Sequence, residues 1–334
     1  MSHPVASLSL DLDNLWSYLK THGDEGWESF PGYLETVVPR ILDVLNDLNL
    51  RCTFFVVGQD AALPKNTEVL RSIVDAGHEI GNHSWSHDPW FHLFDAKQLS
   101  NEVLASELAI MTATGQKPIG WRSPGFSLSD DLLRFLAGHG YQYDASVFPS
   151  CTGPLARLYY FATSGLNRGE RKKRSNLYGS WKDGFQSLNP FQREWNDGSS
   201  LLEVPVTTCP AIRTPIHASY LQFLAKFAEP AANCYFRTAL RLCKFRKIAP
   251  SFLLHPTDFL GKEDSPELAG FFPAMDQPAD VKMRRINRFL SDFANRFEVL
   301  PMGEFAEHHV GQKFSKTAKK ETRNKKHPTP IAVS

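Results

Sequence analysis

Apolar and polar positions along this chain alternate between two spacings, and each change of spacing marks a predicted element. Residues 51–58 form a nearly continuous apolar run, which is typical of a parallel strand covered on both faces. Residues 37–48 instead carry apolar side chains at helical spacing, and the same pattern returns at 69–74. Because short connections separate these segments, we predict an α/β fold built from right-handed strand–helix–strand units.

The same reasoning predicts the remaining elements along the chain. Further strands are expected at 7–13, 118–122, 141–148, 201–207, 251–255 and 298–301. Further helices are expected at 95–111, 129–137 and 281–297, together with two amphipathic helices within 217–247 that meet at Pro230. Residues 14–32 are expected to form a loop.

The domain organisation follows from the places where the alternation of predicted strands and helices is interrupted. Residues 150–200 are rich in Gly, Ser, Asn and basic residues, and a connection of this length is typical of a functional insertion or a disordered loop. From residue 311 onward the chain is basic and polar, which predicts a disordered tail. We therefore predict one domain over 1–310, with the insertion at 150–200 and the helical segment at 217–247, followed by the tail at 311–334.

Composition narrows the class of protein. The 334 residues are 42% hydrophobic, enough for a proper core, and the net charge of +1 gives no pull toward nucleic acid. Five scattered cysteines without a Cys-x-x-Cys pair suggest reduced thiols. The first residues lack a signal-peptide pattern, and we find no apolar run of transmembrane length. These features predict a cytoplasmic protein.

Two histidines and one aspartate form a candidate metal site. His83 and His87 are four residues apart, a spacing that brings both imidazoles to one side of a turn or helix. Asp13, at the end of the first predicted strand, can complete a set of two histidines and one carboxylate, which leaves metal positions open for water and substrate. Zn²⁺ suits this set best, and Co²⁺ or Ni²⁺ would fit it too. Asp11 is then free to act as a base.

Three further motifs lie at later predicted strand ends. They are Gly-Trp-Arg-Ser-Pro-Gly-Phe at 120–126, Tyr-Asp-Ala-Ser-Val-Phe-Pro at 143–149 and Phe-Leu-Leu-His-Pro at 252–256. With the opening Asp-x-Asp and the histidine pair, these five motifs in order resemble those of the polysaccharide deacetylase family, also described as NodB-homology or carbohydrate esterase family four deacetylases. The resemblance covers roughly residues 5–310. It implies a distorted (β/α)7 barrel, which periodicity alone would not separate from an open sheet.

The resemblance also implies catalytic roles. Arg122, from the Arg-x-Pro motif, is expected to hold Asp11 ionised and oriented. His255 is expected to donate a proton to the leaving nitrogen, since an amine cannot depart as an anion at neutral pH. Asp144 matches the first acid of the family's fourth motif and is expected to play a supporting part.

The chain departs from the family pattern at two places. Val147 and Phe148 stand where a second Asp and a Trp are common, so the group that orients His255 stays open, with Asp258 as the substitute candidate. Gly125 stands where a Tyr is common, which predicts a more open pocket.

Substrate contacts are expected near the same motifs. The backbone N–H near Gly125 is expected to stabilise the oxyanion together with the metal. Pro124 shares that turn, and Trp85 and Phe126 are candidates to stack on a sugar, although packing in the core or at the rim explains such aromatic residues at least as well.

These observations favour a metal-dependent hydrolase that removes an N-acetyl or N-formyl group from an aminosugar. The cytoplasmic expectation favours a lipid-linked or other intracellular glycan precursor. The basic cluster at 171–174 and the helices at 217–247 could contact an anionic membrane, or could be a solvated charge run and ordinary covering helices. Two alternatives stay open, a hydrolase of a small cyclic amide or ureide and a non-catalytic carbohydrate-binding barrel.

Overall fold

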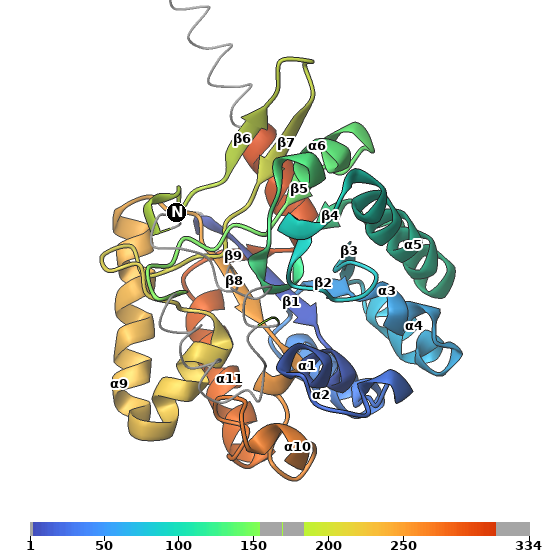
Figure 1. The fold of residues 1–334 in the computed structure, drawn as a ribbon. Coiled ribbons are helices and arrows are strands. Elements are labelled where there is room, and N and C mark those ends of the chain that lie inside the picture. Colours follow the sequence, from blue (N-terminus) through green and yellow to red (C-terminus); the bar gives the residue numbers. More distant parts are fainter. Residues whose placement is uncertain (1–2, 154–168, 170–183, 312–334) are drawn as a thin grey trace, which may run out of the picture.

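A curled sheet surrounded by helices organises the chain in the computed structural model, which describes residues 3–153, 169 and 184–311 (Figure 1). The strands lie in the order β6-β7-β5-β4-β3-β2-β1-β8, and β9 pairs with the first residues of β1. Their bounds are β1 (Val5–Leu12), β2 (Thr53–Val56), β3 (Glu79–Asn82), β4 (Gly120–Trp121), β5 (Tyr143–Asp144), β6 (Phe191–Glu194), β7 (Ser200–Glu203), β8 (Ser251–Leu254) and β9 (Glu298–Leu300).

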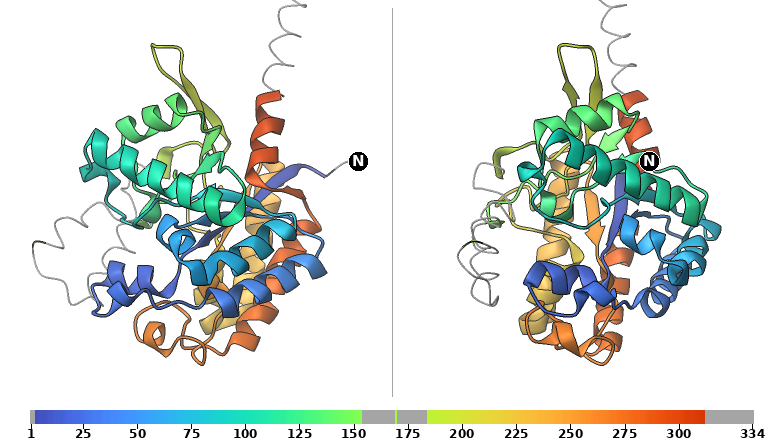
Figure 2. Two further views of the ribbon diagram at one scale, coloured as in Figure 1. Left: turned by 90° about the vertical axis from the view of Figure 1, so that its right-hand side faces the viewer. Right: turned by 45° about the vertical axis from the view of Figure 1, so that its right-hand side comes forward.

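Helices cover the outside of this sheet, as the views from different sides show (Figures 1 and 2). Their bounds are α1 (Leu15–His22), α2 (Leu34–Asp47), α3 (Gly58–Ala62), α4 (Thr67–Asp75), α5 (Ala96–Thr114), α6 (Asp130–Gly138), α9 (Ala218–Phe245), α10 (Pro266–Ala269) and α11 (Ala279–Ala294). Short 3-10 turns lie at Trp27–Ser29, Pro64–Asn66, Phe91–Leu93, Pro124–Phe126 and Pro256–Asp258. Residues 302–311 are also helical.

The parallel strands from β7 round to β8 confirm the expected distorted (β/α)7 barrel. Its closure is irregular, because β7 and β8 do not pair as strands. Instead the Thr207 N–H donates to the Ser251 carbonyl at 3.1 Å, and the Ser251 N–H donates to Thr207 Oγ1 at 2.7 Å. We call this junction between β7 and β8 the seam.

Local sequence explains why the main elements begin and end where they do. β1 is buried from Ala6 to Leu12 because helices and neighbouring strands cover both of its faces. Asn14 caps α1 through its side chain. A capping box of Asp95 and Gln98 starts α5, and Gly115 ends that helix in a left-handed conformation with φ of 76°.

One end of the barrel is filled by the helix at 302–311. Met302 and Phe305 pack with Phe55 and Tyr143 in the interior. The Met302 N–H donates to Thr53 Oγ1 at 2.7 Å, at the start of β2. This helix therefore covers the end where the strands begin, and leaves the opposite end of the barrel for chemistry.

Some expectations need correction. The predicted loop at 14–32 contains α1, because Leu15, Trp16 and Leu19 pack inward after the Asn14 cap. Within 150–200, β6 forms an antiparallel hairpin with β7, and this hairpin projects from the barrel (Figure 1). The basic cluster at 171–174 and the tail from 312 lie outside the described residues.

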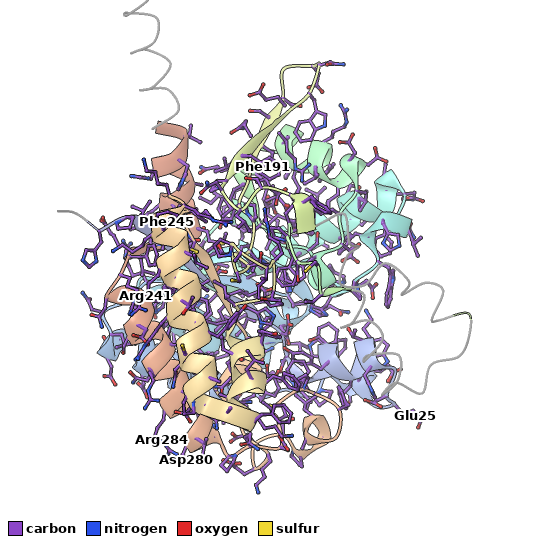
Figure 3. The ribbon with its side chains drawn as sticks, turned by 90° about the vertical axis from the view of Figure 1, so that its left-hand side faces the viewer. Glu25, Phe191, Arg241, Phe245, Asp280 and Arg284 are labelled. Atoms are coloured by element: carbon purple, nitrogen blue, oxygen red, sulfur yellow. The ribbon has the colours of Figure 1, made fainter. Side chains whose placement is uncertain are left out.

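The two helices expected within 217–247 are the two segments of α9. They meet at Ala228, whose φ of −154° and ψ of 88° are not helical, two residues before Pro230. Figure 3 shows the bend, with Arg241 and Phe245 on the longer segment. Among the described helices, we find none long and apolar enough to cross a membrane.

Candidate active site

The predicted site residues meet at the carboxyl ends of neighbouring strands. β4, β3, β2, β1 and β8 are consecutive in the sheet. Asp11 lies near the end of β1 and Asp13 just beyond it, His83 follows β3 and His255 follows β8. Since parallel strands end at the same side of a barrel, residues far apart in sequence are brought to one mouth.

Asp13, His83 and His87 form a buried cluster with the geometry of a metal site. Asp13 Oδ1 lies 3.2 Å from His83 Nε2 and 3.0 Å from His87 Nε2. The three possible ligand atoms all lie within 4.8 Å of one another, and all three side chains are buried. The predicted ligand set is therefore brought together.

The histidine pair lies on a tight loop rather than a helix. Ser84 and His87 both have positive φ values, 68° and 53°. The Ser84 hydroxyl accepts from the His87 N–H at 3.1 Å, and Asn82 Oδ1 accepts from the Ser84 N–H at 3.0 Å. These bonds hold the loop in the strained conformation that turns both imidazoles toward Asp13.

The donor set fits a divalent cation. His83 Nδ1 lies 2.7 Å from the Arg122 carbonyl, which can only accept, so this nitrogen carries the proton and Nε2 keeps a free lone pair. Burial alone would raise the pKa of Asp13, but His87 and His83 outweigh it and lower that pKa well below its usual range. Burial lowers the pKa of His83, yet Asp11 and Asp13 give a net rise. Both shifts have one cause, the attraction between the carboxylates and positive charge on the rings, so the pocket favours positive charge at the position where a cation would bind.

Asp11 is held by a fully buried arginine. Arg122 Nη1 donates to Asp11 Oδ1 at 2.7 Å and to Ser9 Oγ at 2.9 Å, and Arg122 Nε donates to the Ala145 carbonyl at 2.9 Å. The guanidinium carbon lies 4.4 Å from the centre of the Phe55 ring. Asp11 therefore lies beside the cluster of Asp13, His83 and His87, which we call the cation cluster, and the hydrogen bond from Arg122 holds its Oδ1 atom in place. Its role as base stays a prediction.

His255 faces Asp11 from β8. His255 Nε2 lies 3.9 Å from Asp11 Oδ2, and His255 Nδ1 lies 3.2 Å from Ser219 Oγ in the first turn of α9. Asp258, the candidate partner of this ring, lies next to it: Asp258 Oδ2 accepts from the His255 backbone N–H at 2.8 Å, and the Asp258 N–H donates to the His255 carbonyl at 3.0 Å. Its role in orienting the ring stays a prediction. His217 also packs near His255, with 6.1 Å between ring centres.

Asp144 supports a loop rather than touching the cation cluster. Its Oδ1 accepts from the Ser146 hydroxyl at 2.7 Å, and its Oδ2 accepts from the Ser146 N–H at 3.1 Å. Ser146 Oγ in turn accepts from the Ser123 N–H at 2.8 Å. Burial raises the pKa of Asp144 and of its neighbour Glu203. Asp144 thus fixes the backbone just before the predicted substrate turn.

That turn has an unusual backbone. Pro124 is buried, and Gly125 and Phe126 both have positive φ values, 59° and 58°. The Phe126 ring stacks on Phe148 with 4.9 Å between centres. Trp85 is half-buried at the histidine loop. Substrate contact by Trp85, Pro124, Gly125 and Phe126 stays a prediction.

Two site residues escaped the sequence analysis. Glu102 on α5 accepts hydrogen bonds from the N–H groups of Trp85 and Ser86, both at 3.0 Å, and from the Ser86 hydroxyl at 2.7 Å. These hydrogen bonds therefore stabilise the loop that carries His83 and His87. Ser219 is the other, and its only sequence signal was its place at the start of a predicted helix.

Comparisons with known proteins give a consistent result. Residues 24–143 match the family model described as polysaccharide deacetylase. A peptidoglycan deacetylase from Helicobacter pylori is 30% identical over 149 residues, which cover 43% of this chain and 49% of that protein. The match thus spans about half the length of that relative. The family match includes His83, His87 and Arg122, whereas Asp13 and His255 lie outside it.

Solved structures support the fold. A protein from Mycobacterium smegmatis, described as a polysaccharide deacetylase, aligns with a TM-score of 0.60 and 21% identity over 100% of this chain and 94% of that chain. Puue allantoinase aligns with a TM-score of 0.58 and 17% identity over 92% and 90% of the two chains. At these identities the likeness concerns the fold alone.

Proposed function

This chain belongs to the polysaccharide deacetylase family, and we propose from that premise that it is a metal-dependent hydrolase that removes an acyl group from the amino group of a sugar. The buried cluster of Asp13, His83 and His87, together with Asp11 and His255, whose Oδ2 and Nε2 atoms lie 3.9 Å apart, carries this proposal. It combines a cation site with a base and an acid, the three elements that amide hydrolysis needs.

Each of these residues would have a separate role in the reaction. Asp13, His83 and His87 would hold a divalent cation, for which Zn²⁺ is our first choice and Co²⁺ or Ni²⁺ the alternatives. When bound, the cation supplies Lewis acidity, which lowers the pKa of water and polarises an acyl carbonyl. Asp11, fixed by Arg122, would take a proton from the attacking water. His255 Nε2 would give a proton to the leaving amine.

The substrate class is the narrower part of the proposal. The name of the Helicobacter relative favours an aminosugar polymer such as peptidoglycan. A lipid-linked or other intracellular aminosugar, with an N-acetyl or N-formyl group, is the more specific prediction. It would suit peripheral contact with an anionic membrane, for which the exposed Phe227 and Phe245 on α9 are the supporting observation.

Acetate and formate release by the purified protein tests this proposal. The substrates are chito-oligosaccharide, peptidoglycan, a membrane lipid extract and allantoin, each with Zn²⁺ and with a chelator. Because hydrolysis of allantoin opens its ring and releases neither acetate nor formate, that reaction is followed by the ring-opened ureido acid that it forms. We expect an acid from at least one aminosugar substrate, lost with the chelator and in Asp11→Asn, but kept in Asp47→Asn, which changes an exposed carboxylate. Turnover of allantoin alone would favour the cyclic-amide alternative. A carbohydrate-binding module would turn over none of them.

A further inference from the structure

His217 precedes α9 and caps that helix with its side chain. The Tyr220 N–H, in the first turn of the helix, donates to His217 Nδ1 at 3.4 Å. Because a backbone N–H can only donate, Nδ1 presents a lone pair, and the proton of the neutral ring is on Nε2. The cap therefore fixes the tautomer of His217 and leaves one ring N–H for another partner.

This ring stays uncharged at neutral pH. Burial, together with the neighbouring His255 ring, lowers the pKa of His217 to about 3. The His217 ring can therefore remain neutral while His255 takes up a proton. Its Nε2–H is a hydrogen-bond donor without an ionic charge, so it suits a neutral acceptor oxygen better than a phosphate or a carboxylate.

The Nε2 atom of His217 is accessible and has no partner among the described residues. The side chain is partly exposed, and its one hydrogen bond to the described part of the chain uses Nδ1. Nε2 is also not one of the buried side-chain atoms that lack a partner, so it reaches solvent. A donor in this state can bond to a ligand at no cost to the protein's own hydrogen bonds.

The ring contacts place this donor at the mouth of the barrel. The centre of the His217 ring lies 6.1 Å from that of His255 and 5.8 Å from that of Phe148. Phe148 in turn stacks on Phe126 of the predicted substrate turn. His217 thus connects the predicted acid with the predicted substrate turn, and one bound molecule can contact both histidines.

We propose that His217 is a substrate-binding residue whose Nε2–H donates to a sugar oxygen next to the leaving nitrogen. The inference rests on the proposed function, in which His255 gives a proton to that nitrogen. In an aminosugar, the carbon that bears the nitrogen has two neighbours in the ring, and each of them bears an oxygen. Two imidazoles with centres 6.1 Å apart can therefore contact the nitrogen and one of these oxygens together. Such a contact favours aminosugars over amides that lack the oxygen.

Serine and alanine at position 217 separate sugar binding from capping. His217→Ser keeps a side-chain oxygen for the Tyr220 N–H but has no N–H that can reach the sugar, whereas His217→Ala loses both. We expect only His217→Ala to lower the melting temperature. Both variants should raise KM for chito-oligosaccharide about 3- to 10-fold and change kcat by less than about 2-fold, because a bond made equally in the bound substrate and the transition state affects KM alone.

The kinetic result has two outcomes that would overturn the proposal. A fall in kcat without a rise in KM would mean that His217 acts through His255 rather than on the sugar. Recovery of the unaltered KM in His217→Ser, with a raised KM in His217→Ala, would mean that capping is the whole role of the residue.

Sugars that lack single oxygens identify the contact without turnover. N-Acetylglucosamine, its 1-deoxy analogue and its 3-deoxy analogue are titrated into Zn²⁺-loaded protein and followed by NMR. We expect the loss of one of these oxygens to weaken binding about 3- to 10-fold in the unaltered protein but less than about 2-fold in His217→Ser. The analogue that responds identifies the oxygen. The control, His139→Ser at the end of α6, should behave as the unaltered protein does.

The inference and the proposed function fail on different results. Release of acetate, with sugar binding unaltered in His217→Ser, would refute the inference and leave the proposed function standing. Sugar binding that depends on His217, without release of acetate or formate, would refute the proposed function and leave the sugar contact standing. A protein that binds none of these sugars would overturn both.

Discussion

Replacing Arg122 with methionine tests how strongly the proposed base is held. The Arg122 side chain is fully buried and the Asp11 side chain is 5% exposed, so neither charge is screened by water. Methionine keeps much of the apolar volume over the Phe55 ring but removes the donors to Asp11, Ser9 and the Ala145 carbonyl. The stabilities of the variants should be compared in metal-free protein, because a cation beside Asp13 would itself compensate the negative charge of Asp11.

The expected loss follows from the burial of the pair. Removing one partner of a buried ion pair leaves an uncompensated charge and costs about 3–5 kcal/mol of unfolding free energy. Adding Asp11→Asn removes that charge, although Ser9 and Ala145 still lack their donor. We therefore expect the double variant to be about 2 kcal/mol more stable than the sum of the single effects predicts.

Urea unfolding with a chelator, followed by tryptophan fluorescence, measures the four stabilities of this cycle. The matched control is Arg51 with Glu304, an ion pair whose side chains are 51% and 44% exposed. We expect the control pair to couple by less than about 1 kcal/mol, because water screens it. If Arg122→Met and Asp11→Asn added within about 0.5 kcal/mol, the two groups would not be coupled and this account of Asp11 would fail.

Two further predictions concern carboxylates outside the cation cluster. Glu102→Gln should weaken Zn²⁺ binding about 10-fold or more, because an amide cannot accept from the Ser86 N–H and hydroxyl with both of its groups; competition with a coloured chelator measures this, and an equal effect of Glu107→Gln on the same helix would contradict it. Burial raises the pKa of Asp60 from 3.8 to about 6, although Trp16 donates to it at 3.0 Å. The folded chain therefore binds this proton more tightly than the unfolded chain, and the stability gained below pH 4 is lost as the pH rises through 6, a change of about 3 kcal/mol. In urea titrations without metal, Asp60→Asn should be more stable than the unaltered protein at about pH 7.5 and lose this advantage below about pH 4, and a difference independent of pH would contradict the reasoning.

The sequence predicted the parts of the molecule that depend on strand order. Asp13, His83 and His255 each follow a largely buried parallel strand, and the sheet brings the residues after such strands to the same end of the barrel. Arg122 was predicted from its motif, and its contact with Asp11 is present.

What the sequence did not predict depends on packing between distant segments. Ser219 reaches His255 because of the way α9 lies against β8, and no local pattern encodes that distance. Glu102 reads as an ordinary polar position on a helix, and its function becomes visible only when the histidine loop lies against α5. The helix in 14–32 was missed because α1 is only 8 residues long, too short for a clear helical repeat of apolar positions.

The seam has a consequence for which part of this chain can be exchanged. The other junctions between neighbouring parallel strands of the barrel are paired in register, and they include the junctions of β1 and β3, the strands that precede Asp13 and His83. At the seam, β7 and β8 are joined by two hydrogen bonds between Thr207 and Ser251. The chain segment from Thr207 to Ser251 contains the whole of α9. That segment supplies Ser219. Exchange of this segment would therefore change what contacts His255, while Asp13, His83 and His87 would stay as they are.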